Sequence, residues 1–253
     1  MRVYQCEDSL EGIFTAIYNI YEDKCDRNDT RISLTDELLL FAEYIPVEVN
    51  EEKAMKVINT LRRRFGEEDY MKICMALCSS EPEKAQAVYR TVAMGLSKGC
   101  KPGHLLDNLA EISVNMVFSL ARGANNEFLH LRGFIRFAEL ENGILYSKIA
   151  PRNNVLTFLM PHFTDRFPME NLMIYDERRK LFGIHPAGKE WYLVQNQGLK
   201  LEEKELVLSE GEKEYRELFR YFCTKIGIKE RKNLELQRNM LPLRFREFMV
   251  EFK

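Results

Sequence analysis

The 253-residue chain lacks most of the local patterns that identify an enzyme class. It has no glycine-rich phosphate loop of P-loop or dinucleotide-binding spacing, and no nucleophile elbow. Its 4 histidines include no pair at the helical spacing of a metal site. Its 6 cysteines form no Cys-x-x-Cys motif, which excludes the common iron–sulfur patterns. The sequence therefore predicts no metal and no cofactor, and leaves open whether the protein is an enzyme.

Long apolar runs are also missing. No uninterrupted stretch approaches the roughly 20 residues that a membrane-spanning helix needs. The N-terminus reaches Glu7 and Asp8 before any apolar stretch, unlike a signal peptide. The cysteines are scattered, as is typical of free thiols in a reducing compartment. Cys74 and Cys78, four residues apart, could share a ligand or simply be two half-buried apolar residues. We expect a cytoplasmic protein.

The overall composition is that of a globular protein, and its charge is unevenly distributed. Hydrophobic residues make up 45%, charged residues 30%, and the net charge is −2, which excludes a disordered chain. Residues 1–60 carry 6 Lys and Arg against 13 Asp and Glu, whereas residues 213–253 carry 11 against 6. The basic end could bind a polyanion, or it could dock on the acidic end of its own chain.

The apolar spacing changes character along the chain and predicts an α+β fold. Residues 1–130 are predicted to be mainly helical, with a possible strand or loop near Phe41–Val49. Residues 131–197 predict a small, mainly antiparallel sheet with the order β-β-α-β-β-β, whose first hairpin turns at Asn142-Gly143. Residues 198–253 predict a charged connection and a basic C-terminal helical region, with an amphipathic helix around residues 215–226. We expect these regions to pack as one body.

The densest functional pattern is Pro161-His162-Phe163-Thr164-Asp165-Arg166-Phe167-Pro168. His162, Asp165 and Arg166 are candidate catalytic residues, because they could transfer protons and clamp an anion beside a phosphate. The alternative is a tight helix-to-strand corner. There Asp165 and Arg166 would cap or pair, and His162 would bind a backbone carbonyl.

Two basic segments are candidates for binding nucleic acid. In a strand that begins near residue 131, Arg132, Phe134 and Arg136 would share one face of the sheet. Such a face could hold a phosphate backbone and stack a base, or it could be an arginine lying over a half-buried aromatic ring. The second segment spans residues 228–244 and could contact phosphates and base edges, or be a solvated tail. Its candidate residues are Arg231, Asn233, Gln237, Arg238 and Arg244.

Three stretches, in order along the chain, resemble a bacterial family of probable DNA-metabolism or DNA-repair proteins that carries a domain of unknown function. The first is residues 3–18. The second runs from Gly133-Phe134-Ile135-Arg136-Phe137 to the motif around His162. The third runs from residue 228 to Leu241-Pro242-Leu243-Arg244-Phe245. Relatives often carry Trp at positions 172, 219 and 246, where this chain has Leu172, Phe219 and Arg246. The charge of Arg246 puts aromatic stacking at that position in doubt.

The resemblance implies a function but no reaction. Members of the family are encoded beside a radical-SAM protein, and some are joined to a uracil-DNA-glycosylase-like domain. We therefore expect a DNA-metabolism or DNA-repair component that binds nucleic acid, with DNA as a partner, and that works with a radical-SAM protein. Two alternatives remain open: a non-catalytic adaptor for that partner, and an independent nuclease- or glycosylase-like enzyme.

Overall fold

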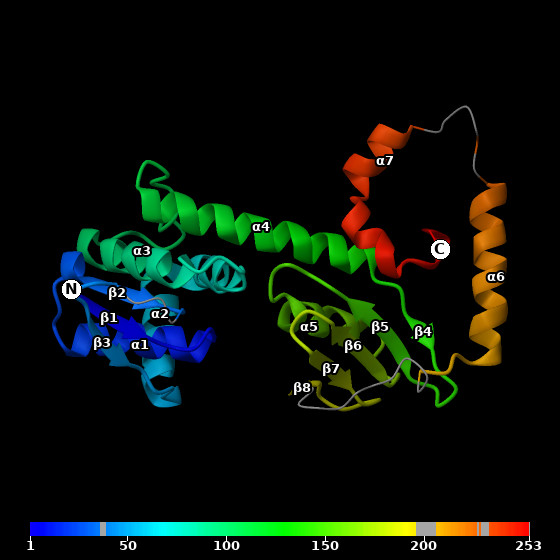
Figure 1. Ribbon diagram of the computed structural model, residues 1–253, viewed down its shortest axis with the longest axis horizontal. Coiled ribbons are helices and arrows are strands. Elements are labelled where there is room, and N and C mark those ends of the chain that lie inside the picture. The colour runs from blue at the N-terminus through cyan, green and yellow to red at the C-terminus, as the bar shows by residue number, and fades with distance from the viewer. Residues whose placement is uncertain (36–38, 196–205, 227, 229–232, 253) are drawn as a thin grey trace. The chain divides into compact units, whose positions relative to one another are not determined.

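The computed structural model describes residues 1–35, 39–195, 206–226, 228 and 233–252. The chain divides into two compact units, Met1–Asn125 and Asn126–Lys253 (Figure 1). The boundary falls within a long helix, α4 (Ile112–Phe134). Helices and strands are both present, which confirms the α+β class. Among the described residues, every helix is too short or too polar to cross a membrane.

The first unit is built around a three-stranded parallel sheet. Its strands are β1 (Arg2–Gln5), β2 (Thr30–Ser33) and β3 (Glu43–Pro46), in the order β2-β1-β3. Helix α1 (Leu10–Glu22) connects β1 to β2 and begins at Ser9, whose hydroxyl accepts a hydrogen bond from the Gly12 N–H at 3.0 Å. A short 3-10 helix, η1 (Arg27–Asp29), precedes β2. The predicted helical half therefore contains a small sheet, whose four-residue strands are too short to show a periodic signal.

Helices α2 (Glu51–Leu77) and α3 (Lys84–Lys98) complete the first unit. The spacing of apolar residues predicts a helix end at Gly66. The structure has a kink there, because Gly66 adopts φ 84° and ψ 168°, which lie outside the helical region. The chain resumes helical geometry directly afterwards. This backbone conformation is accessible almost only to glycine.

The second unit contains a five-stranded sheet in the order β4-β5-β6-β7-β8. The β-β-α-β-β-β order along the chain is the predicted one. The strands are β4 (Ala138–Glu139), β5 (Leu145–Ile149), β6 (Leu172–Asp176), β7 (Leu181–His185) and β8 (Tyr192–Gln195). The sheet is mixed, because helix α5 (Leu156–Arg166) carries the chain across from β5 to a parallel β6, while the other pairs are antiparallel.

Helix α5 packs on the sheet through its apolar face (Figure 1). Its buried side chains are Leu156, Leu159, Met160 and Phe163. Gly183 of β7 permits the close approach, since a Cβ at that position would lie 2.8 Å from the Met160 Cγ. The hairpin between β4 and β5 turns at Asn142-Gly143 as predicted, with Gly143 at φ 75°.

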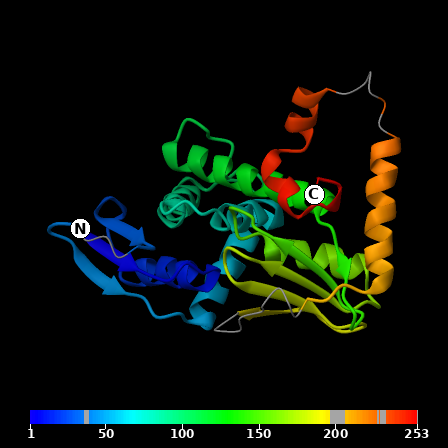
Figure 2. The same ribbon diagram turned by 45° about the vertical axis from the view of Figure 1, so that its right-hand side comes forward.

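The chain after the sheet forms helices α6 (Glu210–Lys225) and α7 (Leu234–Met240) and two 3-10 helices, η4 (Leu243–Phe248) and η5 (Val250–Phe252) (Figure 2). The start of α6 is attached to the β4 edge, because the Ser209 N–H donates to the Glu139 carbonyl at 3.0 Å. Ser209 also caps the helix by accepting a hydrogen bond from the Glu212 N–H at 3.1 Å.

Candidate nucleic-acid interface

His162, Asp165 and Arg166 lie in the last turns of α5, beside its buried face. Their spacing of three and four residues places them on one face of the helix. His162 is half-buried, whereas Asp165 and Arg166 are exposed. Within the described part of the chain, Asp165 and Arg166 form no ion pair with each other. The three residues therefore form an open group at a helix end, and the alternative of an internally paired corner does not describe it.

Arg132 of α4 joins this group from a distant part of the sequence. Burial lowers the pKa of the His162 imidazole below its usual value, and the guanidinium groups of Arg132 and Arg166 lower it further. The Asp165 carboxylate raises the pKa of His162, and this is the smallest of the four contributions. The structure thus brings Arg132, a residue of the first basic segment, close to the α5 residues, which the sequence presents as a separate site.

Both guanidinium groups lie over aromatic rings. The Arg132 guanidinium carbon is 5.5 Å from the centroid of Phe128, and that of Arg166 is 5.8 Å from the centroid of Phe167. Neither arginine forms an ion pair with a carboxylate among the described residues. Two exposed guanidinium groups near an imidazole have the charge and the hydrogen-bond donors that binding an anion with several oxygens, such as a phosphate, would require.

Arg136 is not part of this site, and the prediction that it shares a sheet face with Arg132 and Phe134 is wrong. Helix α4 continues through Phe134, and the Ile135 N–H still donates to the Leu131 carbonyl at 2.9 Å. The helix continues because Phe134 packs against Phe245, with ring centroids 5.7 Å apart. This tertiary contact overrides the strand preference of the segment.

The Arg136 side chain is committed to the protein itself. Its Nη2 lies 2.8 Å and its Nε 3.2 Å from Glu251 Oε1. Its Nη1 donates to the carbonyls of Gly133 and Ile135, each at 3.2 Å. Arg136 thus links the end of α4 to η5. Because its guanidinium nitrogens all donate to protein oxygens, few of its N–H groups remain to bind a phosphate.

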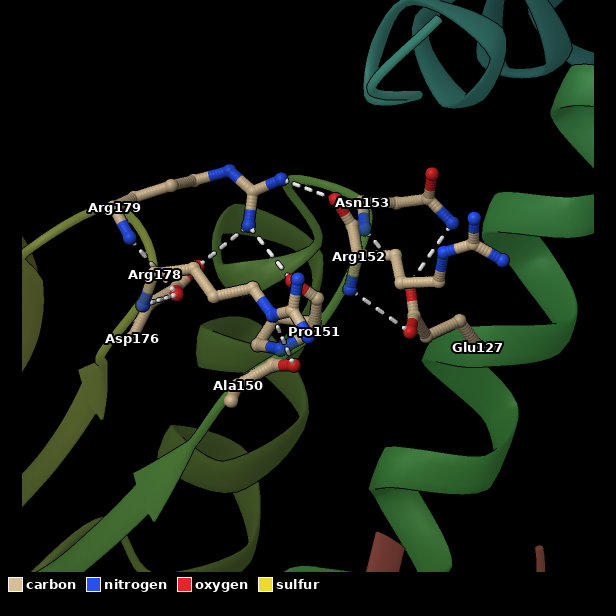
Figure 3. A network of polar contacts seen from close by, with 8 residues as sticks. All are labelled: Glu127, Ala150, Pro151, Arg152, Asn153, Asp176, Arg178 and Arg179. Atoms are coloured by element: carbon tan, nitrogen blue, oxygen red, sulfur yellow. Dashed lines mark hydrogen bonds and ion pairs between the residues drawn. The ribbon is translucent and has the colours of Figure 1, made fainter. Parts of the chain in front are cut away.

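A buried carboxylate holds the loop that leads into α5. Glu127 of α4 is 2% exposed and accepts hydrogen bonds from the Arg152 N–H at 3.0 Å and the Asn153 N–H at 2.8 Å (Figure 3). The side-chain amide of Asn153 donates a third bond to Glu127 at 2.8 Å. These three bonds satisfy a carboxylate that burial would otherwise make costly. They also fix the loop relative to α4, the helix that carries Arg132.

A second carboxylate holds the same loop from the other side. Asp176, at the end of β6, accepts hydrogen bonds from the N–H groups of Arg178 and Arg179 at 3.0 and 3.3 Å. It also pairs with the Arg179 guanidinium at 3.0 Å, and that group donates to the carbonyls of Pro151 and Arg152 at 3.1 and 2.6 Å (Figure 3). The turn-like sequence Asp176-Glu177-Arg178-Arg179 indicates this geometry, because Asp often bonds the backbone two and three residues ahead. No local signal identifies Glu127 as its counterpart.

The C-terminal candidates have separate roles. Asn233 caps α7 by accepting a hydrogen bond from the Leu236 N–H at 2.9 Å, and Gln237 and Arg238 are exposed on the same short helix. Arg244 is exposed and lies over Phe245, 4.8 Å from the ring centroid. Arg231 lies outside the described residues. The structure brings Arg244 beside Arg136 at a cavity of about 30 Å³, which is too small for a nucleobase.

Arg246 has a structural role at the end of α7. Its guanidinium donates to the carbonyls of Leu241 at 2.9 Å and Gln237 at 3.1 Å, and so satisfies acceptors at the end of α7. It also lies over the Phe252 ring, 4.7 Å from the centroid. Arg246 therefore acts as a helix cap in this chain.

The described residues contain no group of three His, Cys, Asp or Glu side chains placed to hold a metal ion. Cys74 and Cys78 are both buried near the end of α2, which fits their interpretation as apolar packing residues.

Comparison with known proteins assigns a family without an activity. The model of DUF4130, a domain of unknown function, matches residues 82–251, about two thirds of the chain. The match includes α4, α5, the five-stranded sheet and the C-terminal helices. No curated protein matches the chain.

Proposed function

We propose that this chain, which belongs to the DUF4130 family, is a DNA-metabolism component that binds nucleic acid through Arg132, His162 and Arg166. One observation carries the proposal: two guanidinium groups from different helices lie near one imidazole, and neither forms an ion pair among the described residues. Arg136 and Arg179, whose side chains hold parts of the fold together, are by contrast paired with carboxylates. Unpaired cations beside one another instead favour a polyanion.

The proposal extends to the class of nucleic acid and to a partner. The rings beneath the two guanidinium groups, Phe128 and Phe167, are half-buried, so their exposed edges offer apolar surface next to the phosphate site. Aromatic surface beside cations is typical of binding to unstacked, single-stranded bases. We therefore propose single-stranded DNA as the preferred ligand. The resemblance described above supports a role in DNA repair and a radical-SAM protein as the functional partner.

Equilibrium binding to labelled single-stranded DNA, duplex DNA and RNA tests the proposal. The test variant is Arg132→Ala/Arg166→Ala, and the matched control is Arg63→Ala/Arg64→Ala. The control removes two exposed arginines from α2 in the other unit. We expect the test variant to bind single-stranded DNA about tenfold or more weakly at low salt, while the control binds like the wild type. Equal loss in both variants, or no binding to any of the three nucleic acids, contradicts the proposal.

A second candidate function follows from the state of His162. Because its pKa is lowered, the ring is neutral near pH 7 and can accept a proton. With two guanidinium groups beside it, His162 could act as a general base in phosphodiester hydrolysis. Incubation of end-labelled DNA with the wild type and with His162→Gln tests this. Cleavage that disappears in the variant supports an enzyme, whereas intact DNA with undiminished binding supports a component without nuclease activity.

A further inference from the structure

Helix α6 has an apolar face that the other described residues of the second unit leave exposed. Four large side chains at helical spacing are more than half exposed: Tyr215 (63%), Leu218 (63%), Phe222 (52%) and, at the C-cap, Ile226 (58%). The spacing of three and four residues places them in one stripe along the helix. In both views of the chain, no other α-helix of the described second unit lies along α6 (Figures 1 and 2).

The covered part of α6 lies beside this stripe. Phe219 and Cys223 are half-buried, and the Arg220 Nε donates to the Val250 carbonyl at 3.3 Å. Helix α6 thus contacts η5 with one side, while the apolar stripe lies on a different side and is exposed. Single exposed apolar residues are ordinary, but a continuous stripe of four on one helix marks an interaction surface.

The charges of α6 are separated along its length. The half from Glu210 to Glu217 carries four Glu against one Lys and one Arg, whereas the half from Leu218 to Lys225 carries one Arg and one Lys and no acid. Two of the four Glu are used within the helix, because Glu210 pairs with Lys213 and Glu212 with Arg216, each at 2.6 Å. The remaining charges give one half a negative character and the other a positive one. Such a helix complements itself when two copies run antiparallel.

We propose that a second copy of this chain covers the stripe, with the two α6 helices packed antiparallel about a two-fold axis near residue 220. In this register Leu218 faces Phe222 of the second copy, and Tyr215 faces Ile226 of the second copy. The same register brings Glu214, which borders the stripe, beside Lys225 of the second copy. Each of these contacts occurs twice, as in any self-complementary two-fold interface. Apolar packing and opposite charges therefore specify the same register.

The charge pair provides the sharpest test. Sedimentation velocity of the full chain from low to several hundred micromolar is expected to show a monomer–dimer equilibrium. Glu214→Lys alone and Lys225→Glu alone each place like charges together twice, and each should weaken dimerisation about tenfold. The double variant Glu214→Lys/Lys225→Glu restores opposite charges and should return the dimerisation constant toward that of the wild type.

The apolar stripe is tested in the same way with a matched control. Leu218→Asp/Phe222→Asp should leave a monomer at every concentration, whereas Thr224→Asp, on the opposite face of α6, should dimerise like the wild type. Circular dichroism checks that each variant keeps its helices, and the charge-reversal series decides the question if the double Asp variant unfolds. A wild-type protein that stays monomeric at every concentration contradicts the proposal. This holds also if hydrogen exchange then shows that another segment of the same chain covers the stripe. A dimer that none of these changes affects also contradicts it.

Discussion

Arg132 of α4 lies near His162 of α5 and, after burial, contributes most to the lowering of the pKa of that imidazole. The two residues belong to different predicted sites and to different helices. Because the two residues are close, the positive charge of Arg132 affects the protonation of the half-buried His162 ring. The pKa of His162 is therefore a measure of this interaction. The relationship can therefore be measured without any ligand.

Removing Arg132 should raise the pKa of His162. Burial still lowers the pKa of His162 in Arg132→Ala, but the repulsion between the guanidinium and the imidazolium is gone, so the value should move toward the usual one. NMR titration of the imidazole proton resonances measures this change. Arg136→Ala is the control, because Arg136 is not among the groups that shift the pKa of His162. An unchanged His162 titration in Arg132→Ala would show that the two side chains do not interact.

Nucleic-acid affinity should rise as the pH is lowered from about 8 to about 6. A bound phosphate stabilises the imidazolium, so the pKa of His162 is higher in the complex than in the free protein. Binding then takes up a proton, and affinity increases as protons become more available. The same binding series with His162→Gln should be flat over this range. An equal pH dependence in both proteins would assign the effect to another group.

Glu127 should be among the most sensitive positions for stability. Glu127→Ala removes the acceptor of three hydrogen bonds and leaves the N–H groups of Arg152 and Asn153 without it. We expect a loss of about 2–4 kcal/mol in the free energy of unfolding, measured by urea denaturation. Glu170→Ala, at an exposed glutamate of the same unit, should change it by less than about 0.5 kcal/mol. Similar values for the two variants would mean that the Glu127 network contributes little.

Two glycines in helices should respond oppositely to alanine. Gly66 has φ 84°, which strains any other residue, so Gly66→Ala should lower the free energy of unfolding by about 1–3 kcal/mol. Gly123 lies inside α4 with nothing near its missing Cβ, so Gly123→Ala should raise it by up to about 1 kcal/mol. Thermal denaturation compares the two. A stabilising Gly66→Ala would show that the kink in α2 is not required by the fold.

The sequence predicts those parts of the fold that local chemistry determines. Asn142-Gly143 predicts a hairpin, Gly66 predicts a helix break, and Asp176 predicts a turn. In each case the residue determines the conformation of the backbone next to it. The ends of α4 are not predictable in this way. Its last turn depends on packing between Phe134 and Phe245, which are more than a hundred positions apart.

The candidate site shows the same division between local and distant determinants. His162, Asp165 and Arg166 share a helix face and can be found by spacing. Their association with Arg132, and the pairing of Arg136 with Glu251, depend on how helices and strands pack. Arg132 and Arg136 look equivalent in sequence, yet among the described residues Arg132 forms no ion pair, whereas Arg136 is paired with Glu251.

This difference between the two arginines permits the most direct test of the account. The affinity for single-stranded DNA is measured over a salt series for the wild type, Arg132→Ala/Arg166→Ala and Arg136→Ala, and log Kd is plotted against log salt. If Arg132 and Arg166 each neutralise a phosphate, the double variant loses about 1.4 from the slope, roughly 0.7 per phosphate, while Arg136→Ala keeps the wild-type slope. An unchanged slope in the double variant, or an equal loss in Arg136→Ala, would contradict the proposed phosphate site.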